Sequence, residues 1–277
     1  MISKKNLIAL SVSMIIAGTA LGQESLNPEF RYEKGKSYRY SLTNNSSFIQ
    51  EMMGQENKGN TMLTQQGTLN INDVDEKGVM TGTFTWEDFS TRTKVMQTDT
   101  VLSFDSYKGK TCDISLTGKG KMRITRSDST VIIQGAPVTP VNTMLQFMSL
   151  PEHPVAKGDT FLVKTIDTAY DANNNPTITE ISRKYVYERR MMAPKDILCY
   201  VFGFEGTVAS SGNIETMGVK MYQETEGTEK GELLLSENGI LVAVHSSNEK
   251  EMTMAVSGQM GMTMSMTLHE TADYRLE

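Results

Sequence analysis

Apolar and polar side chains alternate with a period of two over long stretches of the chain, and this pattern most restricts the folds available. Tyr38, Tyr40 and Leu42 alternate with serine, arginine and threonine, and residues 80–86 repeat the pattern with threonines. Successive side chains of a strand point to opposite faces, so these segments predict strands with one buried and one solvated face. The segment 197–204 is apolar almost throughout, which predicts a strand covered on both faces.

Turn residues separate these runs and indicate antiparallel pairing. Asn238-Gly239 lies between the apolar runs 233–235 and 240–244, which predicts a tight hairpin. One stretch near 140–150 breaks the pattern, because its apolar residues recur at helical spacing between two prolines. We therefore predict an all-β, mainly antiparallel fold, with curved sheets forming a sandwich or open half-barrels and one short helix in that stretch.

The predicted helix divides two similar halves. Gly35 begins the sequence Gly-Lys-Ser-Tyr and Gly158 begins Gly-Asp-Thr-Phe, and each is followed by a polar strand, a turn and a strand ending in aromatic residues. This similarity indicates a duplication whose halves can form one domain. The predicted divisions are a signal peptide at 1–22, a first β half at 23–135, a helix-containing connector at 136–157 and a second β half at 158–277.

The N-terminal residues have the three parts of a secretory signal peptide. Lys4 and Lys5 form a basic start, an uncharged and mostly apolar run covers 7–16, and small residues end at Gly22. The run is shorter than the roughly 20 apolar residues of a membrane-spanning helix, and the residue after it is not the cysteine of a lipid anchor. We expect cleavage before Gln23 and a soluble, exported protein of the periplasm or extracellular space.

The net charge of the mature chain limits its possible partners, and its cysteines limit its possible cross-links. Removing two lysines with the leader takes the formal net charge from −6 to −8, and such a surface repels nucleic acid. No nucleic-acid partner is therefore expected. Because the sequence has no second long apolar run, no integral membrane segment is expected after cleavage. Cys112 and Cys199, one in each half, can form a disulfide outside the cytoplasm, or they can be two separate buried thiols. Their spacing matches neither a zinc site nor a redox motif.

Methionine is unusually frequent, with 20 residues, and six of them share even positions near the C-terminus. Even positions form one face of a strand, whether the chain turns or bulges at Gly258. The six are Met252, Met254, Met260, Met262, Met264 and Met266.

Three interpretations of this methionine face remain open. Methionine can fill an irregular core. Its unbranched, polarisable side chain can also line a cavity for a hydrophobic ligand, with Phe84 and Trp86 as further lining residues. Thioethers select Cu(I), so the face can instead bind copper. The candidate copper ligands are Met260, Met262, Met264 and Met266.

The sequence lacks recognised catalytic motifs. Its three histidines, His153, His245 and His269, form no His-Glu-x-x-His motif, and there is no Gly-x-Ser-x-Gly elbow. We therefore predict a protein without enzymatic activity or cofactor: an exported envelope protein that binds a hydrophobic small molecule or lipid between curved sheets. The alternatives are a structural or interaction protein of the envelope with a filled core, and a methionine-rich Cu(I)-binding protein.

A set of short motifs occurs in a fixed order along most of the chain. They are Gly-Lys-Ser-Tyr at 35–38, Met-Gly-Gln-Glu at 53–56, Asp-Val-Asp at 73–75, Leu-Pro at 150–151, Val155, Gly-Asp-Thr-Phe at 158–161 and the terminal Met/Thr alternation. This set resembles an uncharacterised family of β-rich secreted proteins and lipoproteins of the Gram-negative bacterial envelope. The resemblance implies an all-β fold and that compartment, and no activity. The predicted arrangement of strands is also similar, at the level of the fold, to the curved sheets of periplasmic lipoprotein carriers.

The leader prediction can be tested on the exported protein. N-terminal sequencing and intact mass should give Gln23 as the first residue, and a chain that retains Met1 would contradict the prediction. The same mass reports modification at Thr100, Ser129 and Thr168. These residues follow an aspartate, as in the short motifs that some bacteria O-glycosylate on exported proteins.

Overall fold

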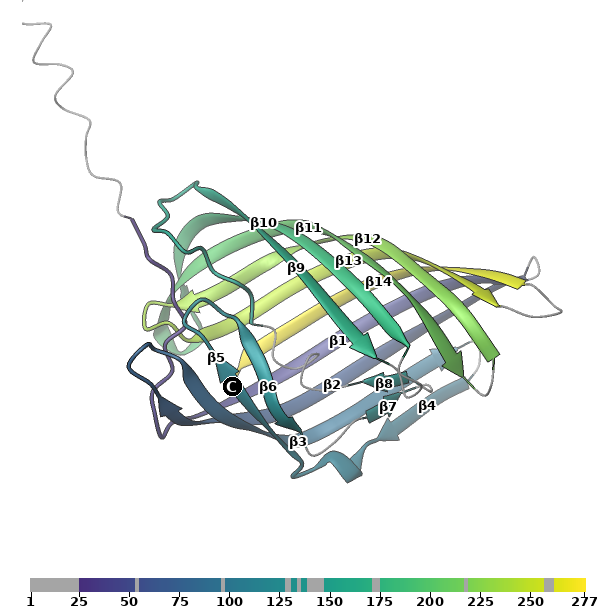
Figure 1. Cartoon of the computed structure of the whole chain (residues 1–277), viewed down its shortest axis with the longest axis horizontal. Coiled ribbons are helices and arrows are strands. Elements are labelled where there is room, and N and C mark those ends of the chain that lie inside the picture. Colours follow the sequence, from purple (N-terminus) through teal and green to yellow (C-terminus); the bar gives the residue numbers. More distant parts are fainter. Residues whose placement is uncertain are drawn as a thin grey trace, which may run out of the picture.

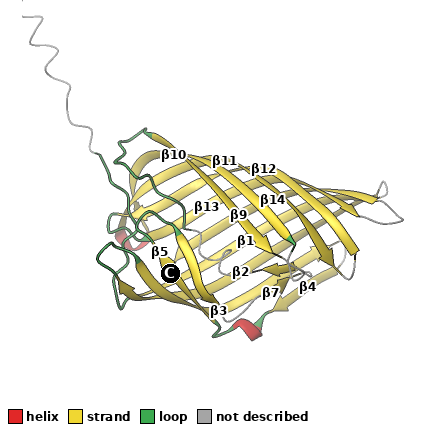
Figure 2. Ribbon diagram, in the orientation of Figure 1, coloured by secondary structure: helices red, strands yellow, loops and turns green. Residues whose placement is uncertain are grey.

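The computed structural model describes residues 25–52, 55–95, 98–127, 131–133, 136–138, 147–170, 175–216, 219–256 and 262–277. Most of these residues lie in one antiparallel sheet of 12 strands that curves around a hollow side (Figure 1). Figure 2 shows how little of the described chain is helical. The predicted all-β, mainly antiparallel fold with a strongly curved sheet is confirmed.

The sheet takes strands from both ends of the chain. Its strands are β1 (Ser37–Met52), β2 (Gln55–Val74), β3 (Met80–Val95), β4 (Thr98–Ser103), β5 (Thr111–Leu116), β6 (Met122–Ser127), β9 (Thr160–Tyr170), β10 (Pro176–Ala193), β11 (Ile197–Thr216), β12 (Val219–Ser236), β13 (Leu241–Val256) and β14 (Met262–Leu276). Their order is β6-β5-β3-β2-β1-β14-β13-β12-β11-β10-β9, and β4 also pairs with β3. Outside it, β7 (Val131–Ile133) pairs with β8 (Ala136–Val138), and η2 (Asp105–Tyr107) and η3 (Pro194–Asp196) are short 3-10 turns.

Strand β1 pairs with β14 along most of its length, so the two predicted halves share one continuous sheet. Each half opens with the same geometry. Gly35 has φ of 77° and its N–H donates to the carbonyl of Ile71 at 2.8 Å; Gly158 has φ of 90° and donates to Tyr187 at 2.8 Å. The positive φ explains why both positions hold glycine. The duplication itself stays a prediction.

The hairpin predicted around Asn238-Gly239 joins β12 to β13. Ser236 N–H donates to the carbonyl of Ile240 at 2.9 Å, and Gly239 N–H donates to the carbonyl of Ser236 at 2.9 Å. Gly239 has φ of 82°, whereas Asn238 keeps a negative φ. The connection is therefore a three-residue loop with a glycine bulge, not the two-residue turn in which both central residues have positive φ.

The predicted helix near 140–150 is not found in its described part. Residues 147–150 have no helical structure, and 139–146 lie outside the described residues. Leu150 N–H donates to the carbonyl of Lys119 at 2.9 Å, and Met148 and Leu150 are buried in the core. This contact with the β5–β6 turn and the burial of alternate side chains hold the segment in an extended conformation.

Large aromatic residues fill the hollow of the sheet at one end, and we call this region the filled end. Tyr40 and Tyr274 stack there with ring centroids 4.8 Å apart, and Trp86 and Phe202 are at most 1% exposed. Segment 25–32 crosses this end. Its residue Tyr32 bonds through its hydroxyl to the hydroxyl of Tyr40 at 2.7 Å.

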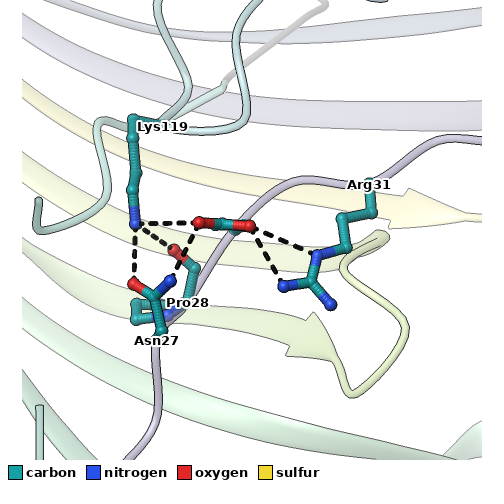
Figure 3. A network of polar contacts seen from close by, with 5 residues as sticks. Asn27, Pro28, Arg31 and Lys119 are labelled. Carbon is teal, nitrogen blue, oxygen red and sulfur yellow. Dashed lines mark hydrogen bonds and ion pairs between the residues drawn. The ribbon is translucent and has the colours of Figure 1, made fainter. Parts of the chain in front are cut away.

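Backbone and side-chain contacts tie segment 25–32 to turns from both halves. Phe30 N–H donates to the carbonyl of Gly118 at 2.7 Å, and Arg31 N–H donates to that of Gly239 at 2.8 Å. Lys119 reaches the carbonyl of Pro28 at 3.0 Å and also contacts Asn27 and Glu29, as Figure 3 shows. Partial burial acts to raise the pKa of Glu29, but Arg31 and Lys119 outweigh it and lower that pKa.

Glycines on the hollow face lie directly under aromatic rings of neighbouring strands. A Cβ atom at Gly67 would lie 2.2 Å from the Phe84 ring, and one at Gly231 would lie 2.6 Å from the Phe204 ring. Each ring therefore occupies the space of the missing side chain on the next strand. Such glycines allow sharp bending of a sheet, while the ring keeps the position packed.

Cys112 and Cys199 are both buried, in two separate clusters. Cys112 lies on β5 in the main core. Cys199 lies on β11 in a small cluster that includes Val201 and Leu234. Burial raises the pKa of the Cys199 thiol to about 11, so this thiol is protonated at neutral pH.

Four buried tyrosines predict loss of stability at alkaline pH. Burial is the main cause that raises the pKa values of Tyr32, Tyr40 and Tyr274, and it raises that of Tyr185 to about 12. Because the folded pKa exceeds the unfolded value of about 10, their stabilising contribution is complete below that pH and is lost as pH rises toward the folded values. Phenolate absorbance should rise in a steep step together with loss of the β circular dichroism signal. Gradual titration of all tyrosines in the folded protein near pH 10 would contradict this.

Candidate functional site

The hollow side of the sheet contains a cavity of about 770 Å³ next to the filled end. The sheet forms its floor, and segments 120–124 and 147–149 lie on its other side. Leu42, Leu63 and Phe204 are among the apolar side chains that line the floor. This volume lies within the range of about 300–1,000 Å³ that is usual for small-molecule sites.

Polar and charged side chains cross the floor of this cavity in one row. Strand register places Arg183, Gly206, Glu229, Asn248, Glu270 and Ser46 next to each other on six successive strands, β10 to β14 and β1. Asn44 and Lys250 adjoin the row on the same face. We call Asn44, Ser46, Arg183, Glu229, Asn248, Lys250 and Glu270 the polar belt.

Arg183 and Glu229 form a two-bond ion pair in the belt. Arg183 Nε lies 2.5 Å from Glu229 Oε1, and Nη2 lies 2.9 Å from Oε2. The Glu229 side chain is 4% exposed, and the guanidinium also lies over the Phe204 ring. Burial acts to lower the pKa of Arg183, but the bonds to Glu229 outweigh it, so the pKa is raised and the charge is retained.

A glycine lies beside each cation of the belt, and its missing side chain leaves space for that cation. Gly206 lies between Arg183 and Glu229, and a Cβ atom there would lie 2.4 Å from a backbone oxygen and 3.2 Å from Arg183 Cγ. Gly227 lies beside Lys250, and a Cβ there would lie 2.7 Å from Lys250 Cγ. Lys250 pairs with Glu270 on the next strand, and both side chains are about one-fifth exposed.

Two acceptors of the belt are buried without a hydrogen-bond donor among the described residues. They are the Oδ1 atoms of Asn44 and Asn248. Both residues line the cavity, on β1 and β13, with β14 between them. Burial of an acceptor without a donor costs free energy, so these two amides reduce the stability of the floor.

The methionine face continues from the belt along β13 and β14. Even positions are half-buried and nearly all odd positions are exposed, so the described methionines share the hollow side. Met252 pairs with Met266 and Met254 with Met264 across the two strands. Gln50 on β1 donates to the Met264 sulfur at 3.8 Å. We call Met252, Met254, Met262, Met264 and Met266 the methionine wall.

The structure separates the other proposed lining residues from this wall. Phe84 and Trp86 pack edge to face with centroids 5.2 Å apart in the filled end, and both are at most 1% exposed. Neither residue lines the cavity beside the belt. Met260 lies outside the described residues. Cu(I) binding by the methionines stays a prediction.

Sequence reasoning missed the polar belt, although a signal for it exists. Arg183 lies two residues from Ile181 and Tyr185, at an inward position of an alternating strand. Glu270 likewise lies between Leu268 and Ala272. A charge that interrupts the apolar face of a period-two pattern indicates a buried polar contact, because such a charge must be paired.

The outer face also carries hollows lined largely by polar side chains. One of about 950 Å³ is lined by charged side chains such as Lys184, Glu205 and Lys230. His245 Nδ1 lies 2.8 Å from Asp273 Oδ1 there. Among the described residues no group of three or more His, Cys, Asp or Glu side chains is placed to hold a metal ion. The described part also has no helix with the length and apolar character to cross a membrane.

Comparison with known proteins assigns no family. No family model and no curated protein match the sequence. Among solved structures, OccK5 (OpdH) of Pseudomonas aeruginosa is 6% identical with a TM-score of 0.29, over 88% of this chain and 99% of that chain. An outer membrane channel from Pseudomonas putida F1 is 6% identical with a TM-score of 0.22, over 91% and 100%. These scores carry no argument about the present chain.

The ion pair of the belt can be tested by removing one or both partners. Arg183→Met leaves the Glu229 carboxylate buried without its cation and should lower the free energy of unfolding by about 3 kcal/mol. Arg183→Met combined with Glu229→Leu should recover most of this loss. Urea unfolding measures both, with Asp99→Asn at the exposed Arg92–Asp99 pair as a control of much smaller effect. Equal stability of the single and double variants would contradict a buried, paired charge.

Proposed function

We propose that this chain is a non-catalytic exported protein of the bacterial envelope that binds an amphipathic, hydrophobic ligand on the hollow side of its sheet. The observation that carries the proposal is the cavity of about 770 Å³ between the polar belt and segments 120–124 and 147–149. Its walls combine apolar side chains with the polar and charged groups of the belt, so one part of an amphipathic ligand can contact each kind of surface.

Packing along the strands favours ligand binding over a filled core. At the filled end, Tyr40, Trp86 and Tyr274 are at most 1% exposed, so no space remains there. Beyond the belt, the methionine wall is only half-buried on the same face. Flexible thioether side chains can adapt to ligands of varied shape, so an acyl chain can lie along this wall.

The proposed compartment agrees with the sequence. The basic, apolar and small-residue parts of the leader support export, and the negative net charge does not favour nucleic acid. Segment 25–32, just after the expected cleavage point, is bonded to turns of both halves, so the mature N-terminus contributes to the fold. We propose a soluble carrier or receptor of a lipid or other hydrophobic small molecule.

A variant that fills the cavity tests the proposal. Ala272 lines the cavity on β14, so Ala272→Phe should weaken binding of a fluorescent fatty-acid analogue at least about tenfold, or about 1.4 kcal/mol. Thr271→Phe, on the exposed face of the same strand, should leave binding unchanged. Circular dichroism confirms that both variants are folded.

A second measurement uses the native protein. Organic extraction of protein purified from its own envelope, followed by mass spectrometry, should release a lipid or other apolar molecule. Absence of any extracted ligand, together with no binding of the fluorescent analogue by the unmodified chain, would end the proposal.

A further inference from the structure

The methionine wall lies outside the cavity, so the cavity alone does not account for it. Met122 and Met148 line the cavity, whereas the five residues of the wall do not. The wall side chains are half-buried, while Met80 and Met148 in the core are 2% and 4% exposed. Methionine that fills the core of this fold is therefore fully buried, and the wall is a different kind of surface.

Strand register brings four methionines of the wall into a two-by-two array on β13 and β14. Met252 lies opposite Met266, and Met254 lies opposite Met264. The Cβ atoms of opposite residues are about 5 Å apart and same-face positions along a strand are about 7 Å apart, so the four Cβ atoms mark a small rectangle. Flexible thioether side chains can bring their sulfur atoms together above its centre. We call Met252, Met254, Met264 and Met266 the methionine square.

The neighbours of the square favour a soft cation over a hard one. Gln223 and Thr225 flank it on β12 and Gln50 flanks it on β1, and Gln50 Nε2 donates to the Met264 sulfur at 3.8 Å. Among the described residues, the positions that adjoin the square on this face hold no carboxylate, histidine or cysteine. Hard divalent cations require oxygen ligands, whereas thioethers select Cu(I).

The charge beside the square is balanced. Lys250 lies two residues from Met252 on the same face, and its ammonium group is paired with Glu270. The chain as a whole has a negative net charge, which attracts cations. A monovalent cation can therefore approach the thioethers without meeting an unbalanced positive charge.

We infer that the methionine square binds one soft monovalent cation, Cu(I), in a site that two neighbouring strands share. The site differs from a run of alternate methionines on one strand, because β13 supplies half of its ligands. Thioethers carry no proton at neutral pH, so the cation displaces none when it binds. This site goes beyond the proposed function and does not depend on it.

Silver ion tests the site, because Ag(I) is a soft monovalent cation that is stable in air. Calorimetric titration of the exported full-length protein in chloride-free buffer should give one Ag(I) per chain with a dissociation constant below about 1 μM. Zn(II) and Ca(II) should not compete. Affinity should be equal at about pH 5.5 and about pH 8, whereas a site made by His245 or His269 would weaken at the lower pH as imidazole gains a proton. Binding weaker than about 1 μM, or a clear loss of affinity at the lower pH, overturns the inference.

Leucine variants locate the ligands, because leucine nearly keeps the volume of methionine and lacks the sulfur. Met254→Leu on β13 and Met264→Leu on β14 should each weaken Ag(I) binding at least about tenfold. Met192→Leu, at a methionine that is 57% exposed and lies outside the wall, should leave binding unchanged. Anaerobic competition against a chromophoric Cu(I) chelator should rank the variants in the same order, and circular dichroism confirms that each is folded.

Two results of the variant series would overturn the inference. A loss of affinity in Met264→Leu with none in Met254→Leu would place the ligands on β14 alone. An equal loss in Met192→Leu would show adventitious binding by exposed thioethers.

Discussion

The sharp curvature of the sheet depends on close contact between aromatic rings and glycines on its hollow face. Phe84 lies over Gly67 and Phe204 over Gly231, so close that a Cβ atom at either glycine would overlap the ring. These pairs let neighbouring strands bend toward the hollow without leaving a void. The filled end, the cavity and the belt all follow from this bend, because a flat sheet would expose the same side chains to solvent.

Curvature also explains how charged groups occupy the hollow face. Gly206 and Gly227 leave room for Arg183 and Lys250 to lie against the sheet and reach acidic partners on other strands. Buried pairs of this kind contribute little net stability, since desolvation offsets much of their attraction. They give the cavity a polar floor on which each charge of the two pairs has a partner of opposite sign. Under the proposed function, such a floor would orient an amphipathic ligand.

The N-terminal segment completes the filled end of an open sheet. Tyr32 places its hydroxyl between Tyr40 and the N–H of Leu241, at 2.7 and 3.2 Å. The same segment is bonded to turns of both halves through Phe30 and Arg31. It therefore links the β5–β6 turn to the β12–β13 turn, which lie far apart in the sheet order. The cavity lies on the other side of this packed layer.

Periodicity and turn chemistry are local, so the sequence by itself determined the strands, the β12–β13 hairpin and the shared face of the described C-terminal methionines. The helical spacing predicted a helix at 147–150 that is absent there, because the segment instead contacts the β5–β6 turn. The sequence also did not identify the ion-pair partners of Arg183 and Glu270. Only the tertiary structure decided that Phe84 and Trp86 belong to a filled core while the belt borders a cavity. The physical reason is that burial and ion pairing depend on register between strands distant in the chain and on the curvature of the whole sheet.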